Sequence, residues 1–483
     1  MSVADRLSSL SREQRALFER LLQQQSHPGA RTPPPVRPVS GPSGVGDWPL
    51  SFDQERLLLL HRDDPGLVAW NVDVGSHVTG ELDVPMFLAA FRELVRRHAA
   101  WRTTFPVVDG RPVQRVHPWV EPGACVIDLS ELPAARKEET GHAALYEHTR
   151  NPFDLEMGPL LRIALVRLAG REHLYQVTIH HTVTDWIAYQ IFFQELIAVY
   201  EAFRAGRLSP LPPPPVQFPD FAVWEREWLQ GEVLDEEARF WRRELEGFPL
   251  VLDLPASRPR PPVQSQRGGL LRIEAGSGRT DRLRALAQKE GGTMFMAVLA
   301  VLNALVRGLT GRDRIVIGSN SANRPRPELA GVAGFFLTQV PFATDVSGDP
   351  TFRELLARTR RTALAAYAHQ NLPFTKLIEA LELEPDPSRY PVVQVLLLVL
   401  EGQSRGRSGN LEFRPVWISD GNSRWDLAIV LYDYHDVGLT GALEYNADIF
   451  DAKDAERLVG RFLSILDAVA ADPDVHLSGL ELR

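Results

Sequence analysis

The spacing of hydrophobic side chains changes along the chain between the periods of helices and strands. Residues 86–100 and 279–309 carry apolar positions three and four residues apart, so each stretch predicts an amphipathic helix. Residues 314–319, 391–400 and 426–434 are rich in Val, Ile and Leu and predict strands. Because both kinds of element are interspersed throughout, we expect an α+β fold with mixed α/β layers.

The period changes most sharply around residues 180–185, which read HHTVTD. Residues 174–179 alternate between apolar and polar as a strand does. From 187 to 203, apolar side chains return every three or four positions, as in a helix. The histidine pair therefore falls in the turn between a strand and a helix, where functional side chains are often placed.

The positions within this turn predict different roles for its polar residues. If the extended backbone continues to His181, this side chain lies on the face of Val177 and Ile179, and His180 lies on the other face. Asp185 precedes the helix and can cap its N-terminus or bind an arginine.

Segments rich in proline and glycine divide the chain. A Ser-Arg-Glu-Gln capping box predicts a helix within residues 1–25, whose apolar face docks either on a partner or on the protein itself. Residues 26–47 form a Pro/Gly-rich linker that cannot pack a core. Two later proline clusters bracket a helical run and separate an N-terminal lobe, 48–222, from a C-terminal lobe, 223–483.

Composition narrows the classes of function. The net charge is −9, from 53 Lys and Arg against 62 Asp and Glu, and basic residues do not cluster, so we expect no nucleic acid as partner. The single cysteine, Cys125, fits a reducing compartment. We find neither a signal peptide nor a membrane-spanning apolar stretch, so we expect a cytoplasmic protein that does not bind membranes. We also expect a monomer.

Two adjacent histidines alone are compatible with a structural role, a metal site or acid–base chemistry. Neighbouring strand residues face opposite sides and seldom share one metal ion. The sequence has no further His, Cys and Asp cluster at ligand spacing, so we expect no metal.

The motif HHTVTDW resembles the H-H-x-x-x-D-G motif of condensation domains of nonribosomal peptide synthetases, in the chloramphenicol-acetyltransferase-like superfamily. Other segments resemble further motifs of this family, in the family's order, from residue 48 to 483. They are PLSFDQERLLLL, RRHAAWRTTF, NPFDLEMGPLLRIALVRL, IGSNSANRPRPELAGVAGFFLTQVP, AHQNLPFTKLIEAL and DPSRYPVVQVLL.

The resemblance implies two chloramphenicol-acetyltransferase-like lobes in a V shape with a central tunnel. Donor and acceptor carrier proteins would approach from opposite faces, each with a substrate on a phosphopantetheine arm, and the domain itself would hold no cofactor. The resemblance assigns the acid–base or positioning role to His181. It makes His180 and Asp185 structural, and we expect Asp185 to pair with Arg102 of the RRHAAWRTTF motif.

The chain departs from the family's motifs at several positions. The motif glycine is Trp186, which either fills the channel, reshapes the substrate pocket or turns into the core. Three other substitutions concern acceptor recognition: Thr338 replaces the usual asparagine, Asn323 a common glycine and Asn371 an aspartate. The residues we expect along the substrate channel are Trp186, Ser319, Asn320, Thr338 and Gln394.

Three functions follow from the resemblance. The first is amide formation between a donor acyl thioester and a carrier-bound amine, in nonribosomal peptide or hybrid polyketide synthesis. The second is ester formation or use of a free acceptor, and the third is non-catalytic recruitment of carrier proteins or tailoring enzymes. Residues 1–25 resemble segments that start a synthetase chain and contact adjacent modules, so we expect either a free-standing enzyme or part of a larger one.

Overall fold

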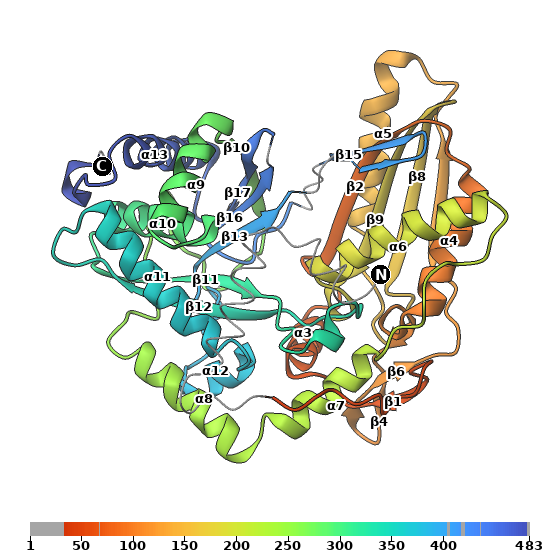
Figure 1. The fold of residues 1–483 in the computed structure, drawn as a ribbon, viewed down its shortest axis with the longest axis horizontal. Coiled ribbons are helices and arrows are strands. Elements are labelled where there is room, and N and C mark those ends of the chain that lie inside the picture. The colour runs from red at the N-terminus through yellow and green to blue at the C-terminus, as the bar shows by residue number, and fades with distance from the viewer. Residues whose placement is uncertain (1–32, 67, 403–405, 417–420, 435, 481–483) are drawn as a thin grey trace.

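A computed structural model provides the fold (Figure 1). The predicted helix within residues 1–25 and the first part of the predicted linker, up to residue 32, lie outside the described residues. The prediction that the linker, 26–47, cannot pack a core is wrong for its described part, because Val36 is buried in the core of the N-terminal lobe. The structure describes residues 33–66, 68–402, 406–416, 421–434 and 436–480.

The N-terminal lobe is built on a six-stranded sheet with the order β14-β15-β2-β9-β8-β7. Helices α4 and α6 pack together over one face, and α5 covers the other. The strands of this lobe are β1 (Gly46–Trp48), β2 (Asn71–Thr79), β3 (Thr103–Thr104), β4 (Val107–Val108), β5 (Arg111–Pro112), β6 (Gln114–Val116), β7 (Gly123–Asp128), β8 (Leu161–Ala169) and β9 (Glu172–His180). Its helices are α3 (Phe52–Asp63), α4 (Val84–Arg97), α5 (Ala134–Thr149), α6 (Trp186–Arg204) and α7 (Phe218–Trp228).

Strand β8 explains why both faces of this sheet are covered. Leu161, Ile163 and Leu165 belong to the core beneath α4 and α6, while the alternate residues Ala164 and Val166 belong to the core beneath α5. Because side chains of a strand alternate between faces, an apolar run such as this one requires helices on both sides.

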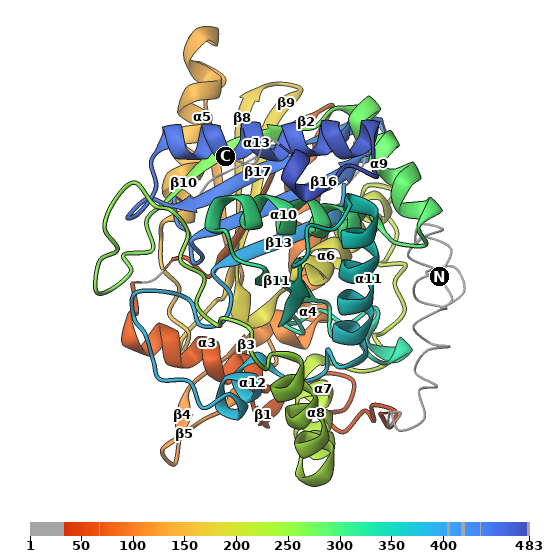
Figure 2. The same cartoon turned by 90° about the vertical axis from the view of Figure 1, so that its left-hand side faces the viewer.

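The C-terminal lobe contains the second six-stranded sheet, with the order β10-β17-β16-β13-β11-β12. Helices α9, α10, α11 and α13 cover the face turned away from the other lobe, and Figure 2 looks onto them. The strands are β10 (Gly268–Glu274), β11 (Arg314–Ser321), β12 (Thr338–Asp345), β13 (Val395–Glu401), β16 (Leu427–Tyr434) and β17 (Gly438–Asn446). The helices are α8 (Gly231–Glu244), α9 (Ser277–Lys289), α10 (Met294–Thr310), α11 (Phe352–Ala368), α12 (Phe374–Ala380) and α13 (Ala452–Ala471).

The prediction of one helix over 279–309 is wrong, because this stretch forms two helices, α9 and α10, bent by 105°. Gly291 has φ +67°, which ends α9, and the Thr293 hydroxyl caps α10 by accepting from the Met296 N–H at 3.3 Å. The bend lets both helices pack on the same sheet.

The lobes are joined in several places. They meet at their lower ends and diverge above, as expected for a V shape (Figure 1). Strands β14 (Gly406–Ser408) and β15 (Leu411–Val416) leave the C-terminal lobe, and β15 pairs with β2 of the N-terminal lobe. The boundary that we predicted between 222 and 223 falls inside α7, so the connection between the lobes is helical there.

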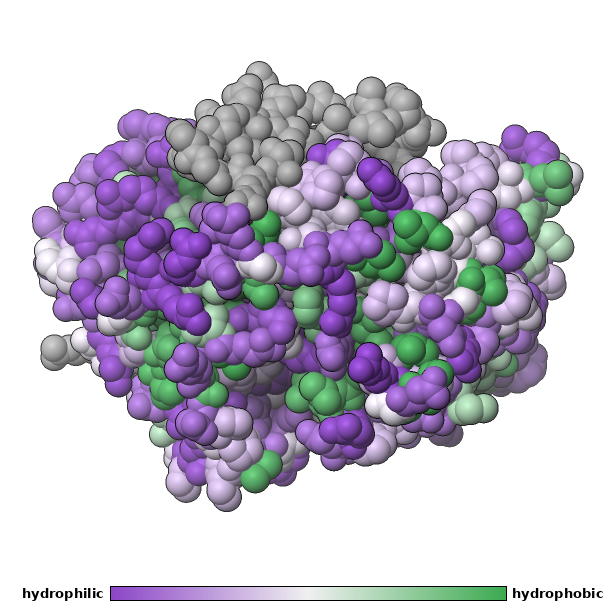
Figure 3. Space-filling view, turned by 90° about the horizontal axis from the view of Figure 1, so that it is seen from below, coloured by the Kyte–Doolittle hydropathy of each residue, from purple (hydrophilic) through white to green (hydrophobic). Residues whose placement is uncertain are grey.

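The face seen from below is mostly hydrophilic, with apolar residues in small separate groups (Figure 3). Among the described helices, none alone is long and apolar enough to cross a membrane; α9 and α10 meet that test only as a bent pair. Since α10 is buried in the core of the C-terminal lobe, its apolar composition is explained by packing.

Candidate active site at the junction of the lobes

The strand–turn–helix arrangement predicted around the histidine pair is confirmed. Strand β9 ends at His180, residues 181–183 form a 3₁₀ turn, and α6 begins at Trp186. The extended backbone therefore stops at His180 and does not continue to His181. The 3₁₀ turn, rather than the period of the strand, sets the direction of the His181 ring.

His181 is held by one hydrogen bond of its backbone N–H and one of its ring, each with a backbone carbonyl oxygen. Its N–H donates to the Trp70 carbonyl oxygen at 2.8 Å, and its Nδ1 lies 2.8 Å from the Thr184 carbonyl oxygen. The rings of Trp70 and Phe335 lie edge-on to the imidazole, with centroids 6.2 and 5.0 Å away. A carbonyl oxygen only accepts, so Nδ1 carries the proton and Nε2 is the basic nitrogen.

The surroundings keep His181 neutral. Burial lowers its pKa to about 4, and the positive charge of Arg424 acts in the same direction. The Arg424 guanidinium lies 4.3 Å from the centroid of the Trp70 ring, and its Nε donates to the Ala69 carbonyl oxygen at 2.6 Å. At neutral pH, His181 therefore offers an uncharged Nε2 that can accept a proton or a hydrogen bond.

His180 is buried and has a different environment. Its Nδ1 lies 2.8 Å from the Thr182 hydroxyl oxygen and 3.3 Å from the Thr182 backbone nitrogen. The rings of His61 and Phe153 pack edge-on against it at 5.9 and 6.1 Å. Burial, above all, holds its pKa well below the usual value. These contacts fit the structural role that the resemblance implied.

Asp185 connects the two lobes. Its Oδ1 accepts from the Ala188 N–H at 2.7 Å, which caps α6. Arg324, from the segment after β11, donates Nη1 to Oδ2 at 3.0 Å and Nη2 to Oδ1 at 3.2 Å. The Phe336 N–H donates to Oδ2 at 3.1 Å. A carboxylate and a guanidinium that are 3% and 6% exposed thus form a buried two-point ion pair between the lobes.

The prediction that Arg102 pairs with Asp185 is wrong. Arg102 is buried and donates to three carbonyl oxygens instead: those of Val95 at 3.1 Å, Ser43 at 2.7 Å and His117. Its location in a 3₁₀ turn after α4 directs it into the N-terminal lobe and toward the linker. Arg324 lies in the motif segment IGSNSANRP, so the sequence contained the correct residue without indicating its partner.

Trp186 lies at the contact between the lobes. Its indole stacks on Tyr189 of α6, with centroids 5.5 Å apart, and meets the edge of Tyr432 of β16 at 5.4 Å. The side chain is half-buried. Of the three placements considered for this residue, the turn into the core is therefore found in part: the indole packs against the core of the N-terminal lobe through Tyr189 and also contacts Tyr432 of the C-terminal lobe.

The predicted channel residues of β11 and β12 lie in the strand pair that leads toward the N-terminal lobe. Ser319 is buried and faces Val340 in the register, while Asn320 is half-buried. The Thr338 hydroxyl accepts from the Phe374 N–H at 3.2 Å, at the start of α12. The contact of these side chains with substrate stays a prediction.

Asn323 occupies a position where the family commonly has glycine, and its backbone has φ +42°. Asparagine is among the few side chains that adopt this left-handed region readily. The substitution therefore preserves the local backbone just before Arg324.

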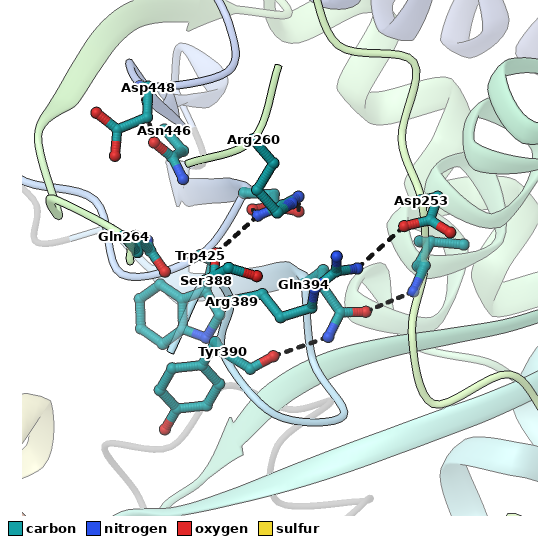
Figure 4. A network of polar contacts seen from close by, with 12 residues as sticks. Asp253, Arg260, Gln264, Ser388, Arg389, Tyr390, Gln394, Trp425, Asn446 and Asp448 are labelled. Carbon is teal, nitrogen blue, oxygen red and sulfur yellow. Dashed lines mark hydrogen bonds and ion pairs between the residues drawn. The ribbon is translucent and has the colours of Figure 1, made fainter. Parts of the chain in front are cut away.

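Gln394 holds backbone segments together (Figure 4). Its Oε1 accepts from the Leu252 N–H at 2.7 Å, and its Nε2 donates to the Tyr390 carbonyl oxygen at 2.8 Å. Nearby, Arg389 reaches Asp253 at 3.0 Å, so the same segments are also joined by an ion pair. Gln394 is only 1% exposed and stabilises the segment at residues 252–253. Its contact with substrate stays a prediction.

Sequence reasoning missed several residues around His181. Phe335 and Arg324 lie in a family motif, so a signal for them existed. Trp70, Arg424 and Tyr432 lie outside the motifs that we identified, and only the fold brings them to the turn.

The fold and the HHxxxD turn define a condensation domain. The family model of the condensation domain matches residues 45–483, and the chain belongs to this family.

The curated relatives are large synthetases. One linear gramicidin synthase protein of Brevibacillus parabrevis is 37% identical over 451 residues, which cover 93% of this chain and 6% of that protein. The phosphinothricin tripeptide synthetase PhsC of Streptomyces viridochromogenes is 35% identical over 478 residues, 98% of this chain and 44% of that protein. The chain therefore spans less than half the length of either relative.

Two solved structures illustrate the range within this fold. The X-domain from teicoplanin biosynthesis, in a complex with OxyB, is 31% identical, with a TM-score of 0.81 over 94% of this chain and 99% of that chain. The first condensation domain of the calcium-dependent antibiotic synthetase, bound to a substrate analogue, has a TM-score of 0.79 over 91% and 99% of the two chains. At 21% identity the second shares the fold alone.

Proposed function

We propose that this chain forms an amide bond between the acyl group of a donor thioester and the amine of an acceptor. Both substrates would arrive on the phosphopantetheine arms of carrier proteins. The observation that carries the proposal is the 2.8 Å contact between His181 Nδ1 and the Thr184 carbonyl oxygen. Because that oxygen only accepts, Nδ1 carries the proton, and the basic Nε2 would act on the substrate.

Aminolysis of a thioester needs one group that transfers a proton and a site that holds the two substrates together. The acceptor nitrogen attacks the thioester carbonyl carbon, the carbon–sulfur bond breaks, and one proton moves from the nitrogen to the departing sulfur. Nε2 of His181 can accept that proton and return it. Holding two tethered substrates together removes a large entropic part of the barrier.

The low pKa of His181 assigns the pH dependence to the substrate. With a pKa of about 4, His181 is neutral throughout the range in which the reaction is measured. The acceptor must be an uncharged amine, and an α-amino group has a pKa of roughly 8. The rate should therefore rise between about pH 6 and 9, with a midpoint of about 8 that follows the pKa of the acceptor.

The test is a reconstituted condensation assay with loaded carrier proteins, read out by mass spectrometry of the intact proteins. We expect product from the wild type and a loss of about 100-fold or more in His181→Ala. His142→Ala, on the solvent-facing side of α5, is the matched control and should retain full activity. Hydroxyacyl acceptors run in parallel distinguish ester from amide formation. Equal rates for His181→Ala and wild type would overturn the proposal.

A second function is favoured by one observation. The 31% identical X-domain forms a complex with OxyB, so a domain of this fold binds another protein. If this chain is a recruitment domain, the wild type gives no product with any acceptor. Loaded carrier or tailoring proteins would then bind the wild type and His181→Ala with equal affinity in calorimetry.

The partners, the oligomeric state and the cellular location are part of the same proposal. Carrier proteins are the expected partners, the monomeric state and the cytoplasmic location stay predictions, and residues 1–25 would contact an adjacent synthetase module.

A further inference from the structure

Helix α6 presents one aromatic face to the C-terminal segments. Trp186, Tyr189 and Phe193 are three and four residues apart, so they lie on the same side of the helix. Trp186 meets Tyr432 of β16 at 5.4 Å, and Phe193 meets Phe413 of β15 at 5.2 Å. These two ring pairs form an aromatic seam along α6, and Trp186 is its end at the HHxxxD turn.

The turn with His181 is therefore held by the C-terminal lobe on two sides. On one side, the segment between β11 and β12 supplies Arg324 to Asp185 and packs Phe335 against the His181 ring at 5.0 Å. On the other side, the indole of Trp186, next to Asp185 in the chain, packs on Tyr432. The ion pair fixes the carboxylate, and the indole fixes the first residue of the helix.

We propose that Trp186 is a positioning residue for condensation, which holds the N-terminus of α6 against β16 and so fixes the His181 turn relative to both lobes. This inference rests on the proposed function. It replaces the idea that the indole simply obstructs a channel that glycine would leave open. A glycine at this position would remove the contact with Tyr432 and leave the turn anchored to the C-terminal lobe from one side only.

The two roles of Trp186 predict opposite effects on the rate. If the indole positions the turn, Trp186→Gly lowers kcat, because a displacement of about 1 Å at a reacting group can reduce a rate roughly 100-fold. If the indole obstructs the donor, Trp186→Gly raises kcat/KM. We expect kcat to fall about 10- to 100-fold in Trp186→Gly and Trp186→Leu, with KM little changed. Trp186→Phe, which keeps a ring against Tyr432, should restore most of kcat.

Phe193→Leu is the matched control. It also removes an aromatic contact of α6, here with Phe413 of β15 in the N-terminal sheet, but it lies seven residues further along α6, about 10 Å from Trp186 at 1.5 Å per residue. A merely stabilising seam would make Phe193→Leu and Trp186→Leu equally harmful to kcat. We expect Phe193→Leu to lower the thermal unfolding midpoint as Trp186→Leu does, while its kcat stays at the wild-type level.

A second measurement tests the inference without any turnover. Hydrogen exchange followed by mass spectrometry should show faster exchange of the amides at 182–188 in Trp186→Gly and in Tyr432→Ala, and no change there in Phe193→Leu. Unchanged exchange in Trp186→Gly would overturn the inference even if the chain condenses nothing. Faster exchange together with an inactive wild type would overturn the proposed function alone. A rise in kcat/KM in Trp186→Gly would establish obstruction.

Discussion

The ion pair between Asp185 and Arg324 makes a prediction whose size follows from its contacts. Arg324→Met removes two hydrogen bonds to Asp185, at 3.0 and 3.2 Å, and one to the Val332 carbonyl oxygen at 3.1 Å. It leaves the carboxylate buried. Removing one partner of a buried ion pair typically costs about 3–5 kcal/mol. Asp185 keeps the N–H groups of Ala188 and Phe336 as donors, so we expect the low end, about 3 kcal/mol.

The assay is urea unfolding, followed by tryptophan fluorescence and far-ultraviolet circular dichroism, because coincident curves are needed for a two-state analysis. Asp185→Asn, Arg324→Met and the double variant complete a cycle, and we expect a coupling free energy of about 2 kcal/mol or more. Asp185→Asn with Arg102→Met serves as the control, and these two changes should add to within about 0.5 kcal/mol. A coupling below about 0.5 kcal/mol for Asp185 with Arg324, or a larger one with Arg102, would refute the assignment of the partner.

Three further predictions concern stability. The pKa of His181 is about 4 in the folded chain, against 6.5 for an unperturbed histidine, and the pKa of His180 is also lowered. Between pH 4 and 6.5 the unfolded chain therefore binds more protons than the folded chain does. The urea midpoint should therefore fall as the pH decreases from 7 toward 4, and less so in a His181→Gln variant; a midpoint independent of pH in this range would contradict the buried, neutral state. Gln394→Leu should lower the free energy of unfolding by about 2–4 kcal/mol in urea, because the buried Leu252 N–H and the partly buried Tyr390 carbonyl oxygen lose their partner; a loss under about 1 kcal/mol would mean that water replaces the amide. Gly291→Ala should lower the free energy of unfolding by about 1–2 kcal/mol, because φ is +67° at this position and disfavours a side chain. Steric clash adds little, since an added Cβ would meet only the end of the Arg360 side chain at 3.7 Å. An unchanged urea midpoint would contradict the left-handed backbone that separates α9 from α10.

Much of the candidate site was predictable from residues near one another in the chain. The alternation over 174–179 and the three-to-four spacing after Asp185 located the strand, the turn and the helix, because the periods of side chains in these elements are local properties of the backbone. The family was indicated by the motifs and by their order along the chain, which can also be read from the sequence without the fold. The helix predicted over 279–309 shows the limit of periodicity, since its apolar positions continue through the two glycines that separate α9 from α10.

The partner of Asp185 shows what the sequence left undecided. A carboxylate at a helix N-terminus predicts that some arginine binds it, and Arg102 and Arg324 both stood in family motifs. The choice depends on which guanidinium reaches the cap. Arg102 satisfies its donors on carbonyl oxygens within its own lobe and linker, while the segment after β11 brings Arg324 across from the other lobe.

By itself, the sequence determined the alternation of elements, the position of the histidine pair between a strand and a helix, and membership of the condensation family. Only the tertiary structure decided which side chains from distant segments surround His181, that β15 completes the sheet of the other lobe, and that Trp186 packs on Tyr432. The reason is physical. Local periods follow from backbone geometry over a few residues, whereas contacts between segments some 140 to 340 residues apart depend on how the two complete lobes pack.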